Sequence, residues 1–143
     1  MPACAAVLGV GIDLVETARV RRLLERYGDA FLRRVFTPEE HAYCMAFAKP
    51  WISLAARFAA KEAVSKAFGT GIGAELTWTS IGIVNDVRGA PSVVLDAKGT
   101  ALLLSCGAAL VHVSLSHTRA HAQAIALLCS APTAALNVPK SEN

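Results

Sequence analysis

Four charged side chains stand in a segment whose other residues would suit a protein core. The stretch from Arg57 to Gly73 reads RFAAKEAVSKAFGTGIG, and its charges are Arg57, Lys61, Glu62 and Lys66. Burying an unpaired charge costs several kcal/mol, which is on the order of the whole stability of a domain. These side chains therefore need charged partners, or an opening in which a ligand completes them.

Ordinary helix pairing is the simplest explanation of these charges. Glu62 and Lys66 are four residues apart, as are Arg57 and Lys61, so each pair shares one helix face. An exposed pair of this kind contributes only about 0.3–0.5 kcal/mol. From the helix alone, pairing and a ligand site are equally well supported.

The glycines that follow the helix favour a ligand site. Gly69, Gly71 and Gly73 stand at alternate positions, and glycine lets backbone N–H groups approach an anion closely. The basic side chains of the preceding helix would add positive charge beside this loop. The loop lacks the Lys-Ser/Thr of a Walker A sequence and does not match the Rossmann fingerprint, so neither of those phosphate sites is expected.

Asp13 supplies a second carboxylate, at the end of a strand expected within the apolar stretch AVLGVGIDLV. Taken alone, an Asp in this position more often caps a helix or forms a turn. Together with Glu62 it could bind magnesium, which is usually coordinated by one or two carboxylates, several waters and phosphate oxygens. The two carboxylates, the nearby basic residues and the glycine loop thus indicate a Mg²⁺–diphosphate site.

Helices and strands of mixed order would position these residues. We expect a buried strand ending at Asp13, a helix capped by Thr37 and ended by Pro50, and a helix over 54–68 ended by Gly69. The other expected elements are a helix over 17–27, strands in LTWTSIGIVND and SVVLD, a short helix over 97–105, and strands in LVHVSLSH and HAQAIALLC. This order predicts an α+β fold in which helices pack on a mostly antiparallel sheet.

Length and composition limit the architecture and the partners. The chain has 143 residues, so we expect one domain over 1–130 followed by a loose tail over 131–143. Hydrophobic residues make up 54% and charged residues 17%, which predicts a large core or a surface covered by another subunit. No apolar run reaches the ~20 residues of a membrane span, and no signal peptide is expected.

Three arginines line one face of the helix expected over 17–27. Arg19, Arg22 and Arg26 form a row beside an apolar face. A solvated helix face is the simple explanation of such a row. Nucleic acid is a weaker one, because the net charge is only +3 and no aromatic residues interleave with the arginines.

Three stretches of the sequence carry motifs at characteristic separations. GVGIDLVETARV places Gly11, Asp13 and Arg19 in the first motif. RFAAKEAVSKAFGTGIG contains the second, Phe-x-x-Lys-Glu-Ala-x-x-Lys-Ala-x-Gly, and VSLSHTRAHAQAIA contains the third, Ser-His-x₄-Ala-x-Ala, which includes His117. Over residues 7–128 the chain resembles the bacterial holo-acyl-carrier-protein synthases, the small 4′-phosphopantetheinyl transferases.

This resemblance implies a transferase reaction. The 4′-phosphopantetheine arm of coenzyme A would pass to a serine of apo acyl carrier protein, leaving adenosine 3′,5′-bisphosphate. The implied catalytic residues are Asp13 and Glu62, which would hold Mg²⁺ (or Mn²⁺), and Lys66, which would offset charge on the phosphates. A carboxylate would take the serine proton directly or through a water, and which one does so stays open.

The resemblance also implies binding roles. The residues implied in coenzyme A binding are Arg57, Lys61, Lys66, Gly69, Gly71, Gly73 and His117, although His117 alone could equally be an ordinary structural histidine. Arg19, Arg22 and Arg26 would dock the acidic helix of the carrier protein. Within this family, a chain of this length implies a homotrimer with sites between subunits. The resemblance also implies a cytoplasmic enzyme of fatty acid biosynthesis that binds neither nucleic acid nor a membrane.

Two other functions remain alternatives to this one. A different transferase that uses coenzyme A or a nucleotide, such as a simple acyltransferase, would need no divalent metal at a diphosphate. A non-catalytic ligand-binding module on the same scaffold would give no product with coenzyme A and metal.

Overall fold

The structure is built from helices and strands in the mixed order expected from the sequence. The computed structural model describes residues 6–132. Its elements in chain order are β1 (Val7–Glu16), α1 (Thr17–Tyr27), α2 (Asp29–Val35), α3 (Pro38–Met45), α4 (Pro50–Phe68), η1 (Trp78–Ser80), β2 (Ile81–Asn85), β3 (Pro91–Leu95), α5 (Ala97–Ser105), β4 (Leu110–His117) and β5 (His121–Cys129). The strands form two antiparallel sheets, one with the order β1-β5-β4 and one of β2 and β3. The α+β fold class is confirmed, and the predicted tail lies, from residue 133 on, outside the described residues.

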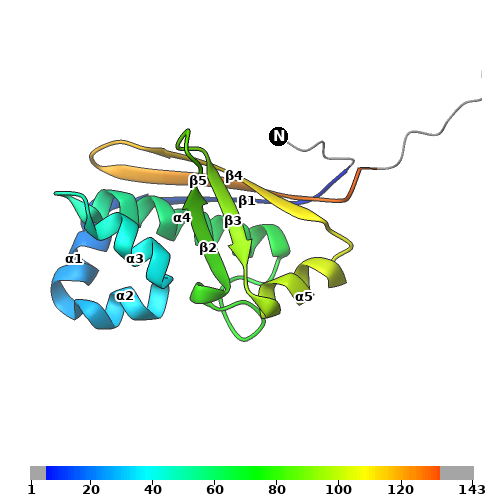
Figure 1. Cartoon of the computed structure of the whole chain (residues 1–143), viewed down its shortest axis with the longest axis horizontal. Coiled ribbons are helices and arrows are strands. Elements are labelled where there is room, and N and C mark those ends of the chain that lie inside the picture. Colours follow the sequence, from blue (N-terminus) through cyan, green and yellow to red (C-terminus); the bar gives the residue numbers. More distant parts are fainter. Residues whose placement is uncertain (1–5, 133–143) are drawn as a thin grey trace, which may run out of the picture.

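Helix α4 lies against the three-stranded sheet and forms the centre of the core. Figure 1 shows α4 running below β1, β4 and β5, with α1, α2 and α3 gathered at one end of the molecule and α5 at the other. Leu54, Val64 and most of the alanines of α4 are buried, so the helix is apolar on nearly every side, as its sequence predicts. Within residues 6–132, no helix, α4 included, combines the length and apolar character needed to cross a membrane.

Two glycines bring β1 into direct contact with the backbone of α4. A Cβ atom placed on Gly11 would lie 1.8 Å from the carbonyl oxygen of Ala63, and one on Gly9 would lie 2.1 Å from that of Ala67. No side chain can occupy this space. Because side chains alternate along a strand, Asp13 lies on the same face of β1 as the two glycines and points toward α4.

The opposite face of β1 is apolar and exposed. Its side chains are Leu8, Val10, Ile12 and Leu14, with exposed fractions of 47%, 60%, 54% and 62%. Ile125 of β5 stands opposite Ile12 in the sheet and extends this patch, which we name the outer sheet face. No element among the described residues covers the outer sheet face, so part of the apolar composition belongs to the surface.

Two helix boundaries differ from those expected. Pro50 begins α4 instead of ending the helix before it, because proline suits a first turn in which no backbone N–H is needed. The preceding helix α3 already ends at Met45. The short helix α2 was not expected; it follows Gly28, whose positive φ of 51° lets the chain turn directly from one helix into the next.

The capping box predicted at the start of α3 is confirmed. The backbone N–H of Glu40 donates to Thr37 Oγ1 at 3.3 Å, and the N–H of Thr37 donates to Glu40 Oε2 at 2.8 Å. Glu40 is itself buried. A buried carboxylate needs a cationic partner, and Lys61 of α4 provides one at 2.8 Å.

Candidate active site

Asp13 and Lys66 are in direct contact where β1 packs on α4. Lys66 Nζ lies 2.9 Å from Asp13 Oδ1 and also donates to the carbonyl oxygen of Ile12 at 2.9 Å. The Asp13 side chain is mostly covered, with 17% of its surface exposed, whereas that of Lys66 is about half exposed. The contact therefore lies at the border between the core and the solvent, where a ligand can reach it.

Glu62 completes this group, and we call Asp13, Glu62 and Lys66 the carboxylate cluster. Partial burial raises the pKa of the Glu62 carboxyl, and the negative charge of Asp13 raises it further. The positive charges of Lys66 and Arg19 lower it. Two carboxylates thus share one partly dehydrated site, where an added cation would stabilise both of them.

The ligands that the carboxylate cluster offers fit magnesium. Within residues 6–132, no group of three or more His, Cys, Asp or Glu side chains could hold a metal ion. Zinc sites use three or four such ligands, whereas magnesium takes one or two carboxylates and completes its shell with water and phosphate oxygens. Asp13 and Glu62 therefore suit a divalent ion whose remaining ligands come from a phosphate compound.

Arg57 lies on another face of α4 and is held by neutral partners. Its Nη1 donates to Ser53 Oγ at 3.1 Å, and its Nη2 donates to Asn85 Oδ1 at 2.7 Å. The guanidinium lies over the ring of Tyr43, 4.3 Å from the centroid. Its Nε is buried without a hydrogen-bond partner, and no carboxylate within residues 6–132 forms an ion pair with it. A buried guanidinium in this state attracts an anionic ligand.

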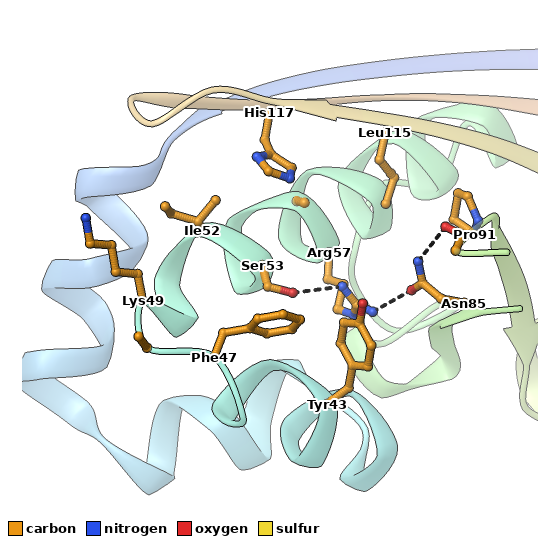
Figure 2. A pocket seen from close by; sticks show the side chains of 13 residues that line it. Tyr43, Phe47, Lys49, Ile52, Ser53, Arg57, Asn85, Pro91, Leu115 and His117 are labelled. Carbon is orange, nitrogen blue, oxygen red and sulfur yellow. Dashed lines mark hydrogen bonds between the residues drawn. The ribbon is translucent and has the colours of Figure 1, made fainter. Parts of the chain in front are cut away.

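A pocket of about 560 Å³, which we call the arginine pocket, opens beside Arg57. Figure 2 shows His117 pointing from β4 into this space, with the Arg57 guanidinium farther down, beside Ser53 and Tyr43. Tyr43 and Asn85 lie beyond the guanidinium, and Lys49 lies at the other end of the pocket. Arg57 and His117, which are 60 positions apart in the numbering, are thus brought to one cavity of a size suited to a small ligand.

The carboxylate cluster and the arginine pocket lie on different sides of α4. Arg57 and Glu62 are five residues apart in the sequence, which places them about 140° apart around the helix. Asp13 and His117 stand on β1 and β4, the outer strands of the sheet, with β5 between them. Two strand spacings amount to roughly 10 Å. One copy of the chain therefore keeps the carboxylate cluster and the arginine pocket apart, on different sides of α4, and we refer to these two groups of candidate residues as half-sites.

The family of the chain follows from comparison with known proteins. The family model of the 4′-phosphopantetheinyl transferase superfamily matches residues 9–128. The chain belongs to this superfamily. It is 49% identical over 121 residues to the holo-[acyl-carrier-protein] synthase of Chlamydia trachomatis serovar D, a match that covers 85% of this chain and 98% of that protein. The resemblance seen in the three motifs is confirmed.

Solved structures of the superfamily share the fold. The holo-[acyl-carrier-protein] synthase of Neisseria meningitidis matches with a TM-score of 0.81 and 36% identity, over 86% of this chain and 98% of that one. The Helicobacter pylori holo-[acyl-carrier-protein] synthase in complex with coenzyme A matches with a TM-score of 0.75 and 32% identity, over 83% of this chain and 98% of that one.

In this member of the superfamily, Lys61 belongs to the core and to neither half-site. Its side chain has no exposed surface, and its Nζ lies 2.8 Å from Glu40 Oε2 and 2.9 Å from the carbonyl oxygen of Trp78. Burial lowers the pKa of Lys61, and the Glu40 carboxylate opposes that shift. Contrary to the prediction that Lys61 helps to hold coenzyme A, it has no surface with which to contact a ligand.

The glycine loop uses its backbone donors within the chain. The N–H groups of Gly69, Gly71 and Gly73 donate to backbone carbonyls at 2.9, 3.2 and 2.9 Å. Gly69 and Gly71 have positive φ values of 77° and 65°, which other residues rarely adopt, so glycine is needed there to end α4 and turn the chain. The turn accounts for these glycines without an anion, and a ligand role for them rests on the family resemblance alone.

The arginine row (Arg19, Arg22 and Arg26) of α1 is exposed and lines a shallow hollow of the surface. Arg19 lies over the ring of Phe58, 5.7 Å from the centroid, and its charge acts on the carboxyl of Glu62. The row therefore begins beside the carboxylate cluster and leads away from it along α1.

Asn85 and Tyr43 contact Arg57 and were not predicted as site residues. Asn85 ends β2, and its Nδ2 donates to the carbonyl oxygen of Gly89 at 2.9 Å. An Asn before a turn is common in proteins, so its position gave no signal of a site. Tyr43 packs edge to face with Phe47, with ring centroids 5.3 Å apart. In the sequence, only the four-residue spacing of these two aromatic residues hinted at this contact.

Proposed function

We propose that the chain transfers the 4′-phosphopantetheine arm of coenzyme A to a serine of apo acyl carrier protein. The products are holo carrier protein and adenosine 3′,5′-bisphosphate. The observation that carries this proposal is the carboxylate cluster, in which Asp13 and Glu62 share a partly dehydrated site with Lys66. Relatives named holo-[acyl-carrier-protein] synthase, one of them solved in complex with coenzyme A, support it.

The carboxylate cluster fits the charge changes of this reaction. Mg²⁺ bound by Asp13 and Glu62, or Mn²⁺ with similar ligand preferences, supplies positive charge to the diphosphate of coenzyme A. The serine oxygen bonds to the phosphorus that bears the pantetheine arm, and the bond from that phosphorus to the adenosine bisphosphate oxygen breaks. Lys66 Nζ offsets negative charge on these phosphates, and a carboxylate oxygen of the cluster accepts the serine proton, directly or through a water.

The arginine pocket is proposed to hold the nucleotide phosphates of coenzyme A. Arg57 offers a guanidinium that no carboxylate of the described chain neutralises, and His117 and Lys49 line the same cavity. Charge-assisted hydrogen bonds from a guanidinium to phosphate are strong and directional. Because Ser53 and Asn85 already orient Arg57, little side-chain entropy is lost when the phosphate binds.

We further propose a homotrimer in which two copies of the chain complete each site. The half-sites lie on different sides of α4, so a coenzyme A molecule held by one copy could present its diphosphate to the carboxylate cluster of another. The outer sheet face is an exposed apolar surface of the kind that subunit contacts cover. Closed rotational symmetry would bring each half-site against its complement in a neighbouring copy.

Val10→Glu is expected to dissociate this assembly and to remove activity. Val10 lies in the middle of the outer sheet face, and covering that face would then bury an unpaired carboxylate. Light scattering should give the mass of three chains for the wild type and of one chain for the variant. The matched control is Val87→Glu in the β2–β3 loop, where the side chain is fully exposed and the assembly should persist. An active monomer at assay concentration would contradict shared sites.

Arg26→Glu is expected to raise the KM for carrier protein roughly tenfold while the KM for coenzyme A stays unchanged. The arginine row offers exposed guanidinium groups, which suit the carboxylates of an acidic helix. Added salt should likewise raise the KM of the wild type for carrier protein and leave its KM for coenzyme A unchanged, since exposed charges are screened beyond about 8–10 Å. Initial rates at varied carrier protein and salt concentrations provide the measurement.

The control for this charge reversal is Lys98→Glu. Lys98 is exposed on α5, at the other end of the molecule from α1, and the substitution changes the net charge by the same amount (Figure 1). An equal rise in KM for both variants would show that net charge alone attracts the carrier. No rise for Arg26→Glu would identify the arginine row as a solvated face.

Intact-mass analysis of apo acyl carrier protein tests the proposed reaction. Incubation with the chain, coenzyme A and Mg²⁺ should add one phosphopantetheine arm, and a chelator should prevent the addition. Binding of coenzyme A without any change of carrier mass would indicate a non-catalytic module. Product formed equally well in the chelator would argue for chemistry without a divalent metal. From the same relatives we infer that the enzyme acts in the cytoplasm.

A further inference from the structure

The ion pair between Lys61 and Glu40 is fully buried and fully satisfied. Lys61 Nζ lies 2.8 Å from Glu40 Oε2, and both side chains have no exposed surface. The ammonium also donates to the backbone carbonyls of Trp78 and Ile81. The Glu40 carboxylate accepts from the backbone N–H of Thr37 and, through Oε1, from that of Ile83 at 2.9 Å. Neither side chain has a polar group left over for a ligand.

These hydrogen bonds close the open edge of β2. On one side, β2 pairs with β3, and the bond from Asp96 N–H to the Ser80 carbonyl at 3.0 Å continues that ladder. Along a strand, successive residues direct their N–H and C=O groups to opposite edges, so residues two apart share an edge. The C=O of Ile81 and the N–H of Ile83 point away from β3, and Lys61 and Glu40 bond them there. The ion pair thus takes the place of a third strand at this edge.

The strand held in this way forms one wall of the arginine pocket. β2 ends at Asn85, whose Oδ1 accepts from Arg57, and the following loop and the start of β3 contribute Gly89 and Pro91 to the lining. Lys61 and Arg57 are one helical turn apart on α4. The same helix therefore contacts β2 twice, through Lys61 at the strand edge and through Arg57 at the strand end.

We propose that Lys61 and Glu40 are positioning residues for the arginine pocket. They hold β2 at a fixed place against α3 and α4, so that Asn85 meets the Arg57 guanidinium and orients it toward the pocket. The pair acts through Asn85 and Arg57 and does not touch the ligand. That this ligand is the nucleotide end of coenzyme A rests on the proposed function, but the effect on the pocket itself does not.

The test is the double variant Lys61→Met with Glu40→Gln, which removes both buried charges together. Lys61→Met alone would leave the Glu40 carboxylate buried without its partner and would unfold the chain. In the double variant, the dissociation constant for coenzyme A, measured by calorimetry, should rise roughly tenfold, the effect of losing one charged hydrogen bond. The kcat at saturating coenzyme A should stay within about twofold, since the carboxylate cluster is on the other side of α4. Hydrogen exchange of the amides over 81–90 should become faster.

A matched control separates positioning from a general loss of charge. Glu39→Gln with Lys98→Met also removes one carboxylate and one ammonium, but from exposed positions, and should change neither binding nor exchange. Wild-type binding and exchange in a folded Lys61→Met/Glu40→Gln variant would overturn the proposal. If that variant does not fold, native-state hydrogen exchange of the wild type is the deciding measurement. The Ile83 amide should exchange as slowly as the amides of α4. Faster exchange of Ile83, independent of α4, would also overturn the proposal. A wild type that binds coenzyme A without making product would refute the proposed function and leave these results valid.

Discussion

Glu62→Gln and Asp13→Asn are each expected to slow phosphopantetheine transfer by roughly 100-fold or more, the effect of losing one preorganised electrostatic contact in an active site. Each substitution keeps the shape of the side chain and removes its charge. The carboxylate cluster would then offer one anionic ligand instead of two, so affinity for a divalent metal should fall most. Raising Mg²⁺ should restore part of the activity if the loss is one of metal affinity.

Initial rates over a range of Mg²⁺ concentrations check this result. The matched control is Glu75→Gln, an exposed carboxylate in the loop after α4 for which no ion pair is found within residues 6–132. This control should keep wild-type rates at every metal concentration. Near-normal turnover of Glu62→Gln or Asp13→Asn at low Mg²⁺ would show that the residue concerned is not a metal ligand.

Both variants should keep the fold. The bond between Asp13 and Lys66 is partly open to solvent, and such pairs contribute about 1 kcal/mol or less. Burial and the negative charge of Asp13 both raise the pKa of Glu62 in the folded protein, so removing the charge of Glu62 relieves both unfavourable effects. Thermal unfolding should therefore show only small shifts, and a large fall in Tm would indicate that the loss of activity reflects unfolding.

Gly11→Ala is expected to destabilise the folded chain by about 3 kcal/mol or more, at the upper end of the cost of overpacking. A Cβ atom at this position would lie 1.8 Å from the Ala63 carbonyl oxygen and 2.7 Å from the Ala67 nitrogen. Both atoms belong to the backbone of α4 and cannot rotate away. The strand must shift instead, and Asp13 shifts with it away from Glu62 and Lys66.

Thermal unfolding measures the cost of this clash, with an expected fall in Tm of roughly 10 °C or more. The matched control is Gly73→Ala, the same substitution at a glycine with nothing within 4 Å of the added Cβ atom. That control should melt within a few degrees of the wild type. Equal Tm values for the two variants would show that β1 can move away from α4 at little cost.

The carboxylate cluster was predictable because its signals are local. Glu62 and Lys66 are four apart on one helix, and Asp13 lies within a recognisable motif, although the strand predicted to end there continues to Glu16. The capping box at Thr37 was predictable for the same reason. The α+β fold class followed from the order of elements, since strands that follow each other through short turns pair with each other.

Other parts of the site depend on contacts that are distant in the sequence. Lys61 and Lys66 both lie in α4, where alanines occupy most sides of the helix. The apolar residues around the two lysines therefore do not indicate which lysine faces inward. Lys61 is inside because Glu40, on another helix, provides its charge partner. Likewise, the glycines of the loop after α4 were predicted to bind an anion, but whether a backbone N–H is available depends on which carbonyl the folded chain brings to it.

The buried pair of Glu40 and Lys61 also limits how this sequence can change over generations. A single neutral substitution at either position leaves one unpaired buried charge in the protein. Such a charge costs several kcal/mol, which is on the order of the whole stability of a domain. Two neutral residues could replace the pair, but only if both codons change together or a stabilising substitution elsewhere comes first. The two positions are therefore expected to evolve as one unit, and a lineage could retain them because viable intermediate sequences are scarce.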